Sequence, residues 1–277
     1  LGRFKHEGAK VTIAPDGRLA VYMGDNQRFE YIYKFVSKNR YQPGNRAANM
    51  RLLEEGTLYV ARFNENGSGD WLALVHGQNG LTAANGFADQ GEVLVKTRMA
   101  ADLVGATKMD RPEWITADPF TAGSIYCTLT NNSQRGEAGK PAADAANPRA
   151  NNLFGHIIHW QEADGDGTKL SFKWDILVLA GNKQAAKPEH KGNINGDDFG
   201  SPDGLAFDNR GVLWIQTDVS TSTLNMKEYA GMGNNQMVAT VLGSNEYRRF
   251  LTAPNGSEVT GIAFTPDNKT MFINIQH

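Results

Sequence analysis

Four acidic residues recur at the start of similar segments of the sequence. The segments cover residues 7–25, 113–130, 203–218 and 258–276, and each consists of an acid, an apolar strand, a turn and a second strand. When the segments are aligned on their turns, Glu7 and Glu258 are equivalent, and Glu113 and Asp203 fall two residues further along. Because side chains on a strand alternate with period two, all four acids are expected on the same face.

Carboxylates that converge in this way repel one another unless cations neutralise them. Oxygen ligands suit Ca²⁺, Fe³⁺ or Mn²⁺ better than Zn²⁺ or Cu. The sequence therefore predicts a metal site formed by Glu7, Glu113, Asp203 and Glu258. In the alternative interpretation each acid accepts backbone N–H bonds and caps its own hairpin.

Arg111 stands two residues before Glu113, in the string DRPEW that begins at Asp110. A planar guanidinium beside cations is well suited to holding a phosphate group during its transfer. The spacing alone is equally compatible with a surface arginine paired with Asp110.

The repeated strand pairs predict an all-β fold. A β-propeller arranges four-stranded sheets around a central channel, and the start of each innermost strand opens on that channel. A sandwich or a double-stranded barrel also contains many short strands, but neither has a reason to repeat an acid. We therefore expect one propeller domain over residues 1–277, with loops at residues 39–51, 76–90, 133–152 and 181–200 and no more than a turn or two of helix within residues 89–104.

Composition excludes several classes of protein. The 277 residues carry 28 basic and 30 acidic side chains, with no long block of one charge, so a nucleic-acid partner is not expected. The longest aliphatic run, residues 176–180, is far too short to cross a bilayer. One cysteine, Cys127, excludes an internal disulfide. Since the sequence has no initiator Met or leader and stops within a strand pattern at His277, we expect a fragment of a longer protein.

Several long strings resemble one protein family in order along essentially the whole chain. They include GDNQRFEYIYKFV from Gly24, MDRPEW from Met109, YCTLTNN from Tyr126, NPRANN from Asn147, SPDGL from Ser201 and EVTG from Glu258 followed by NIQH from Asn274. These strings resemble the PhoX family of bacterial alkaline phosphatases.

The resemblance implies a monomeric, exported phosphomonoesterase of the periplasm or the medium. Its fold would be a six-bladed β-propeller, of which this chain would supply about four to five blades, with Fe³⁺ and Ca²⁺ as cofactors. On this basis Glu113 resembles an iron ligand, Glu7 and Asp203 resemble iron or calcium ligands, and Arg111 resembles the phosphate-binding arginine. Glu258 joins the set from its register, and Arg149 and Asn152 are expected to border the substrate site.

One part of the family pattern is missing. The family's iron-bridging cysteine and further ligands belong to a Trp- and Gly-rich motif nearer the N-terminus, which this chain lacks. Cys127 lies in a different motif and is predicted to be a small buried residue. A calcium-binding propeller that holds a ligand without turnover is therefore the alternative function, and this fragment alone fits that description even if its parent is an enzyme.

Overall fold

The strands dominate the structure, a computed structural model that describes residues 1–276. The largest sheet has nine strands in the order β1-β2-β3-β4-β5-β9-β8-β7-β6. In chain order these are β1 (His6–Ile13), β2 (Arg18–Asp25), β3 (Ile32–Arg40), β4 (Gly56–Phe63), β5 (Ser68–Ala73), β6 (Pro112–Ala117), β7 (Ser124–Leu129), β8 (His156–Glu162) and β9 (Ser171–Leu179). This sheet curls so that its two end strands, β1 and β6, pack against each other.

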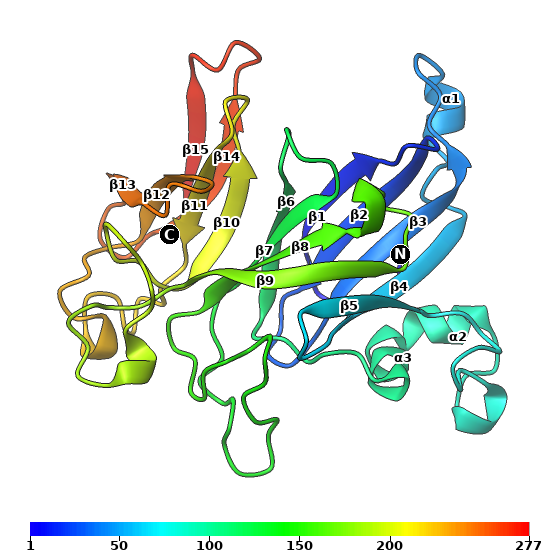
Figure 1. The fold of residues 1–277 in the computed structure, drawn as a ribbon, viewed down its shortest axis with the longest axis horizontal. Helices are drawn as coiled ribbons and strands as arrows, with labels where there is room; N and C mark the ends of the chain where they lie inside the picture. Colours follow the sequence, from blue (N-terminus) through cyan, green and yellow to red (C-terminus); the bar gives the residue numbers. More distant parts are fainter. Residues whose placement is uncertain (277) are drawn as a thin grey trace.

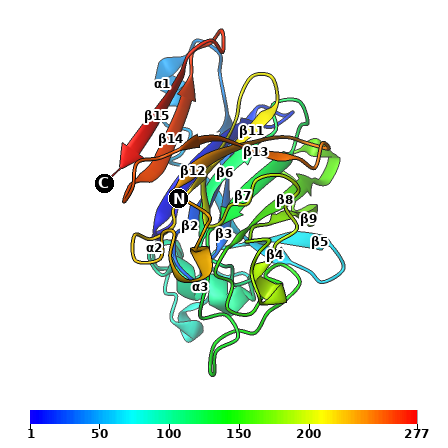
Figure 2. The ribbon, with the colours of Figure 1, turned by 90° about the vertical axis from the view of Figure 1, so that its left-hand side faces the viewer.

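Two smaller sheets follow along the chain. The first contains β10 (Pro202–Phe207), β11 (Val212–Thr217), β12 (Gln236–Val241) and β13 (Tyr247–Thr252), and the second pairs β14 (Glu258–Phe264) with β15 (Met271–Gln276). The β14–β15 hairpin stands out from the rest of the molecule (Figures 1 and 2). His277, which the sequence pattern places at the end of this last strand, lies outside the described residues.

Helices are few and short within the part of the chain that the structure describes. They are α1 (Arg46–Asn49), α2 (Gln90–Val95), α3 (Thr97–Val104) and the single 3₁₀ turns η1 (Ala83–Asn85), η2 (Ala163–Gly165), η3 (Pro188–His190) and η4 (Lys227–Tyr229). The prediction of helix within residues 89–104 is confirmed by α2 and α3, which at 6 and 8 residues are together longer than the expected turn or two. Across residues 1–276 no helix combines the length and the apolar character that a bilayer crossing requires.

The four predicted hairpins are all present, and their first strands lie side by side. Strand β1 packs on β6, β6 packs on β10, and β10 packs on β14, as Figure 1 shows. Each of these strands is followed at once by its antiparallel partner. The all-β prediction is therefore confirmed. The propeller arrangement of the sheets and the number of blades stay predictions.

Apolar layers separate successive sheets. A cluster of aromatic residues that includes Trp71, Trp160 and Phe172 fills the interior of the nine-stranded sheet. A second layer, with Phe154 and Phe199 at its centre, joins that sheet to β10–β13. Cys127 belongs to the first layer and is fully buried, so its prediction as a small buried residue is confirmed. Burial of these layers provides the main favourable contribution to folding.

The first strand of each hairpin, which we call an innermost strand, is irregular at or beside its acid; these strands are β1, β6, β10 and β14. The pairing register shifts between Glu7 and Ala9 in β1 and between Val259 and Gly261 in β14. It also shifts across the segments that contain the acids of β6 and β10. A β-bulge bends its strand and changes the direction of the side chains beside it. The four bulges therefore occur where the acid side chains must leave the regular pleat.

The first and second hairpins approach closely because of a glycine. A Cβ atom on Gly24 would lie 2.5 Å from the carbonyl oxygen of Glu113, too close for any side chain. The absence of a side chain lets β2 lie directly against the start of β6.

Candidate metal centre and phosphate site

The four predicted acids converge at the adjoining starts of the innermost strands. Burial raises the pKa of Glu113 and of Glu258, and the negative charges of Glu7 and Asp218 raise both further. Asp203 is close enough to Glu113 and Glu258 for their negative charges to add to the effect of burial and raise its pKa. Acids that are separated by about 50 to 250 residues in the sequence thus share one site.

Asp218 belongs to the same site, although the sequence did not single it out. One carboxylate oxygen each from Asp203, Asp218 and Glu258 lies within 4.8 Å of the other two. Asp218 follows β11, just as Asp25 ends β2 in the first hairpin. The sequence signal was therefore an Asp at the end of the second strand of a repeat. Asp25 shows that this signal is not sufficient, because Asp25 is paired with the guanidinium of Arg98 on α3.

Within the described residues, Arg111 is the basic side chain that contacts this carboxylate cluster. Its Nη2 lies 2.9 Å from Oε1 of Glu113 and 3.7 Å from Oδ2 of Asp218. The contact with Glu113 has the distance of an ion pair without the angles of a hydrogen bond. Its Nε donates to Oδ1 of Asn26 at 2.8 Å, and Asn26 in turn donates to Oε2 of Glu7 at 3.2 Å. The alternative pairing of Arg111 with Asp110 is wrong, because Asp110 is paired with the buried Arg135.

The backbone is strained where Arg111 enters β6. Arg111 has φ of 64° and precedes Pro112, and Ser201 has φ of 53° and precedes Pro202 at the equivalent point of β10. A residue before proline normally adopts an extended conformation, and left-handed non-glycine residues are uncommon. Such conformations cluster at functional sites, where they are part of how side chains are positioned. The two innermost strands thus begin with the same unusual turn.

The carboxylates lack sufficient neutralising charge in the described structure. Glu113 and Asp203 are buried, and Oε1 of the first and Oδ1 of the second have no hydrogen-bond partner. Burial raises the pKa of Glu113 to about 8, with the charge of Arg111 acting in the opposite direction. Burial is also the main cause that raises the pKa of Asp203 well above its ordinary value. Five carboxylates against one guanidinium leave an excess of negative charge.

This donor set fits hard multivalent cations. All the available ligand atoms are carboxylate oxygens, which Ca²⁺ and Fe³⁺ accept, and two of them are buried and unpartnered. No cysteine or histidine is among the residues of the cluster, so a soft-metal site is not indicated there. The residues that would hold cations are Glu7, Glu113, Asp203, Asp218 and Glu258.

Two cavities meet at Arg111. One, of about 600 Å³, is lined by Lys5, His6, Glu7, Asn26, Gln27, Arg28 and Arg111. The other, of about 320 Å³, is lined by Arg28, Arg111, Asn131, Ser133, Leu153, Ser201, Asp218, Ser220, Ser222, Thr223, Glu228 and Tyr229. The guanidinium of Arg111 is therefore accessible from two sides, at the edge of the carboxylate cluster.

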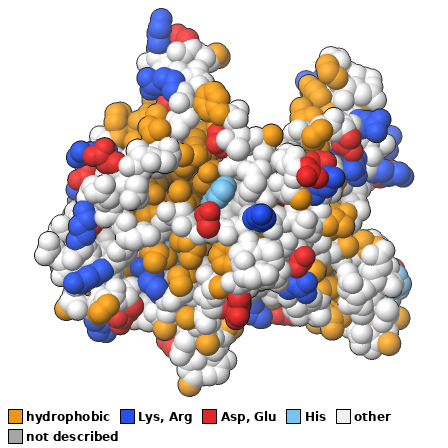
Figure 3. All heavy atoms as spheres, in the orientation of Figure 1, with side chains coloured by type: hydrophobic (Ala, Val, Ile, Leu, Met, Phe, Trp, Pro, Cys, Tyr) orange, Lys and Arg blue, Asp and Glu red, His pale blue; other side chains and the backbone are white. Residues whose placement is uncertain are grey.

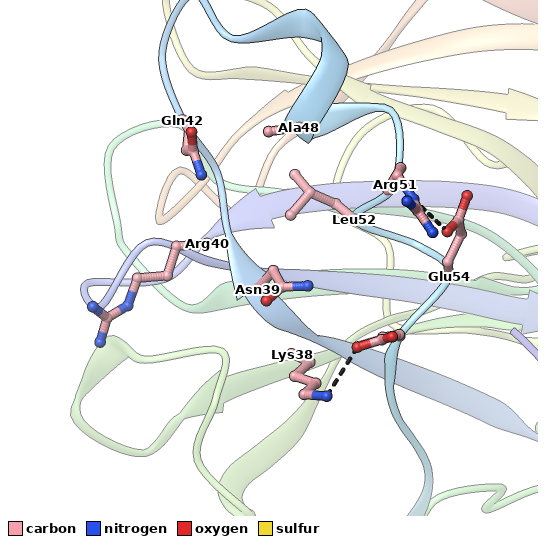
Figure 4. A pocket seen from close by; sticks show the side chains of 9 residues that line it. Lys38, Asn39, Arg40, Gln42, Ala48, Arg51, Leu52 and Glu54 are labelled. Atoms are coloured by element: carbon pink, nitrogen blue, oxygen red, sulfur yellow. Dashed lines mark hydrogen bonds and ion pairs between the residues drawn. The ribbon is translucent and has the colours of Figure 1, made fainter.

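A further cavity lies away from this chemistry. It is formed by the end of β3 and the α1 segment, and Figure 4 shows its lining side chains. Four of its charged groups form exposed ion pairs, Lys38 with Glu55 and Arg51 with Glu54. Arg40 is the fifth charged residue of the lining. On the face drawn in Figure 3, basic and acidic side chains are likewise interspersed.

Arg149 and Asn152 are held by buried polar contacts. Arg149 donates to the carbonyl oxygens of Ala180, at 2.7 Å, and of Gly155. Asn152 donates to Oδ2 of Asp110 at 2.9 Å. These bonds hold both side chains in place, although Nε of Arg149 is buried without a partner, and the cavities at Arg111 are lined by other residues. Their contact with substrate stays a prediction.

Comparison with known proteins assigns the family. The family model described as alkaline phosphatase PhoX matches residues 1–277. The chain belongs to the PhoX family. A solved structure, Pseudomonas fluorescens PhoX in complex with vanadate, a transition state analogue, is 49% identical to this chain and superposes with a TM-score of 0.94. The search of curated proteins gave no match.

The match covers the chain completely but the relative only in part. It includes 100% of this chain and 49% of the PhoX chain from P. fluorescens. The present chain thus spans about half the length of that relative.

Proposed function

We propose that the protein is a metal-dependent phosphomonoesterase of the PhoX type that hydrolyses phosphate monoesters. The observation that carries this proposal is the position of Arg111, whose guanidinium contacts Glu113 and Asp218 at the edge of a carboxylate cluster and faces two cavities. Membership of an alkaline phosphatase family supports it, as does the P. fluorescens PhoX structure, which is in complex with vanadate, a transition state analogue.

The cofactors would be Fe³⁺ and Ca²⁺, held by Glu7, Glu113, Asp203, Asp218 and Glu258. When bound, such ions supply positive charge for the phosphate oxygens and make an oxygen nucleophile available near neutral or alkaline pH. The choice of these two metals, the six-bladed propeller, export to the periplasm or medium, and a monomeric state all follow from the family resemblance and are part of the proposal.

The residues of this chain orient the phosphate. Arg111 binds non-bridging oxygens of the phosphate through the N–H groups that face the cavities. Asn26 accepts a hydrogen bond from its Nε and Glu113 pairs with its Nη2, so the plane of the guanidinium is fixed before substrate binds. A fixed guanidinium stabilises charge that develops on the phosphate during transfer without reorganising.

The test compares Arg111→Gln with wild type, both purified with their metals. Hydrolysis of p-nitrophenyl phosphate is measured together with metal content, and Arg46→Gln, at an exposed position on α1, is the matched control. We expect Arg111→Gln to lower kcat/KM by about 10²- to 10³-fold, with metal content unchanged. Full activity in this variant would contradict the proposal.

The second candidate is a calcium-binding propeller that holds ligand without turnover. The cluster of Asp203, Asp218 and Glu258 favours it, since these three acids could bind Ca²⁺ without any help from Arg111. Calcium without iron in the purified protein, together with no hydrolysis of p-nitrophenyl phosphate, would select this alternative. Iron and calcium together with hydrolysis would select the phosphomonoesterase.

A further inference from the structure

Arg28 lies beside Arg111 and lines both of the cavities that Arg111 lines. Its side chain is partly buried, yet it has neither an ion pair nor a hydrogen bond within residues 1–276. The neighbouring guanidinium groups differ in this respect, because Arg111, Arg98 and Arg135 all contact carboxylates. Arg28 therefore offers unused N–H donors and an uncompensated positive charge next to the phosphate site.

The backbone around Arg28 is fixed relative to Arg111. Arg28 forms a β-bridge with Asp110, the residue before Arg111, and the amide of Phe29 donates to the carbonyl of Met109 at 2.8 Å. Phe29 adopts a left-handed conformation with φ of 69°. Two residues before Arg28 in the same turn, Asn26 accepts the hydrogen bond from Nε of Arg111. One turn thus holds the guanidinium of Arg111 through Asn26 and fixes the backbone of Arg28 beside it.

The smaller cavity has the lining expected of a site for a polar alcohol. Asn131, Ser133, Ser220, Ser222 and Thr223 present amide and hydroxyl groups to it. The one aromatic residue among its lining residues is Tyr229. Its hydroxyl group is already engaged, by Ser201 and by the carbonyl of Leu153.

Acidic groups in this cavity leave Arg28 free to act on a ligand. Asp218 belongs to the carboxylate cluster and would face its cations, and Glu228 is exposed to solvent. Neither forms an ion pair with Arg28 in the described structure. The positive charge at the shared wall of the two cavities is thus available to substrate.

We propose that Arg28 binds a second anionic group on the alcohol part of the substrate, so that the enzyme favours phosphate monoesters whose alcohol carries a carboxylate or another phosphate. Arg111 holds the phosphate that is hydrolysed, and Arg28 pairs with the second charge across the wall that the cavities share. The hydroxyl-lined wall accepts the remaining polar atoms. This inference rests on the proposed phosphomonoesterase function.

The kinetic test uses a matched pair of substrates, 3-phosphoglycerate and glycerol 3-phosphate, which differ in a carboxylate replaced by a hydroxymethyl group. With the protein purified with its metals, Arg28→Gln should lower kcat/KM for 3-phosphoglycerate by about ten-fold, mainly through KM, because a charge-assisted bidentate pair is lost. For glycerol 3-phosphate the change should stay within about two-fold. Arg46→Gln should alter neither value, and Arg28→Lys should restore part of the loss.

A binding test separates this proposal from the proposed function. Calorimetry with two ligands that cannot be hydrolysed, 3-phosphonopropionate and propylphosphonate, should give tighter binding of the first in wild type and equal binding in Arg28→Gln. If Arg28→Gln lowers affinity equally for both ligands and kcat/KM equally for both substrates, or changes none of these values, the role of Arg28 is overturned. Continued hydrolysis of the substrates would in that case leave the proposed function intact. Discrimination between the ligands in a protein that hydrolyses neither substrate would instead support Arg28 as an anion site and overturn the proposed function.

Discussion

Two buried charged sites in this molecule are built in opposite ways. Inside the nine-stranded sheet, Nζ of Lys34 lies 3.2 Å from Oε2 of Glu162, and both side chains are fully buried. Trp71 and Trp160 donate indole N–H groups to the same carboxylate, and Lys34 also donates to the carbonyl of Lys169 at 2.7 Å. The chain itself supplies every partner that this site needs.

The carboxylate cluster at the innermost strands lacks such compensation. Glu113 and Asp203 keep buried oxygens without partners, and one arginine faces five acids. A buried charge is tolerated where it is paired and hydrogen-bonded, and it is destabilising where it is not. The first site is therefore complete in itself, whereas the second has unpaired negative charge that cations would neutralise under the proposed function.

The largest effect should come from breaking the complete site. Lys34→Met leaves Glu162 buried without its counter-charge and should lower the free energy of unfolding by about 3–5 kcal/mol in urea denaturation. Lys38→Met on the same strand is the matched control, because its partner Glu55 is exposed and the pair should contribute about 0–1 kcal/mol. Equal effects of the two substitutions would contradict the comparison.

Removal of cations should affect the other site. Treatment of wild type with a chelator should lower the free energy of unfolding by about 3 kcal/mol relative to protein with Ca²⁺ at a hundred times its dissociation constant, because the ions bind only the folded chain. The Lys34→Met variant should lose the same amount of unfolding free energy on treatment with chelator, since Lys34 and Glu162 form a separate site. A thermal midpoint that is unaffected by chelator would argue against resident cations.

Glu113 and Lys34 should also respond to pH with opposite signs in the metal-free protein. The pKa of Glu113 is raised from 4.5 to about 8, so the folded state retains a proton that the unfolded state releases, and stability should fall as pH rises through this window. The pKa of Lys34 is lowered from 10.5 to about 8 by burial, so stability should recover between these two values.

Denaturant titrations of the metal-free protein from pH 5 to 10 provide this measurement. Glu113→Gln should make the descending part of the curve shallower, with Asp203 and Glu258 accounting for what is left, and Lys34→Met should remove the recovery. A descending part as steep as that of wild type in Glu113→Gln would show that Glu113 does not cause it.

The smallest effect should appear in Asp218→Asn. In the metal-free protein it removes one repelling charge and should raise the free energy of unfolding by about 1 kcal/mol, while Ca²⁺ binding weakens. Asp164→Asn, at an exposed position in η2, is the control and should change neither property. A variant that loses stability without metal would show that Asp218 serves a structural purpose.

Much of the fold could be predicted because its signals are local. Turn residues such as those at Asp16 and Gly17 mark the hairpins, and the acids mark the starts of the innermost strands. The pairing of β5 with β9, which joins two parts of the largest sheet, has no such signal because it links residues about a hundred positions apart. Long-range pairing is decided by packing of whole sheets.

The site was predicted in part for the same reason. Glu7, Glu113, Asp203 and Glu258 lie at related positions of the repeats, which a sequence displays. Asp218 could not be separated from Asp25 without knowing that Asp218 lies beside Asp203 and Glu258, whereas Asp25 pairs with Arg98. Arg28 lies within a string that resembles the family, but its position beside Arg111 becomes visible only when two cavities are seen to share both side chains.

Direct Ca²⁺ binding to the metal-free protein tests the central claim, that the converging acids form a cation site. Isothermal titration calorimetry of wild type is compared with the triple variant Asp203→Asn, Asp218→Asn, Glu258→Gln, with circular dichroism as the check on folding. Our account predicts saturable binding in wild type that the folded triple variant loses. Undiminished binding in the triple variant, or no binding in wild type, would contradict it.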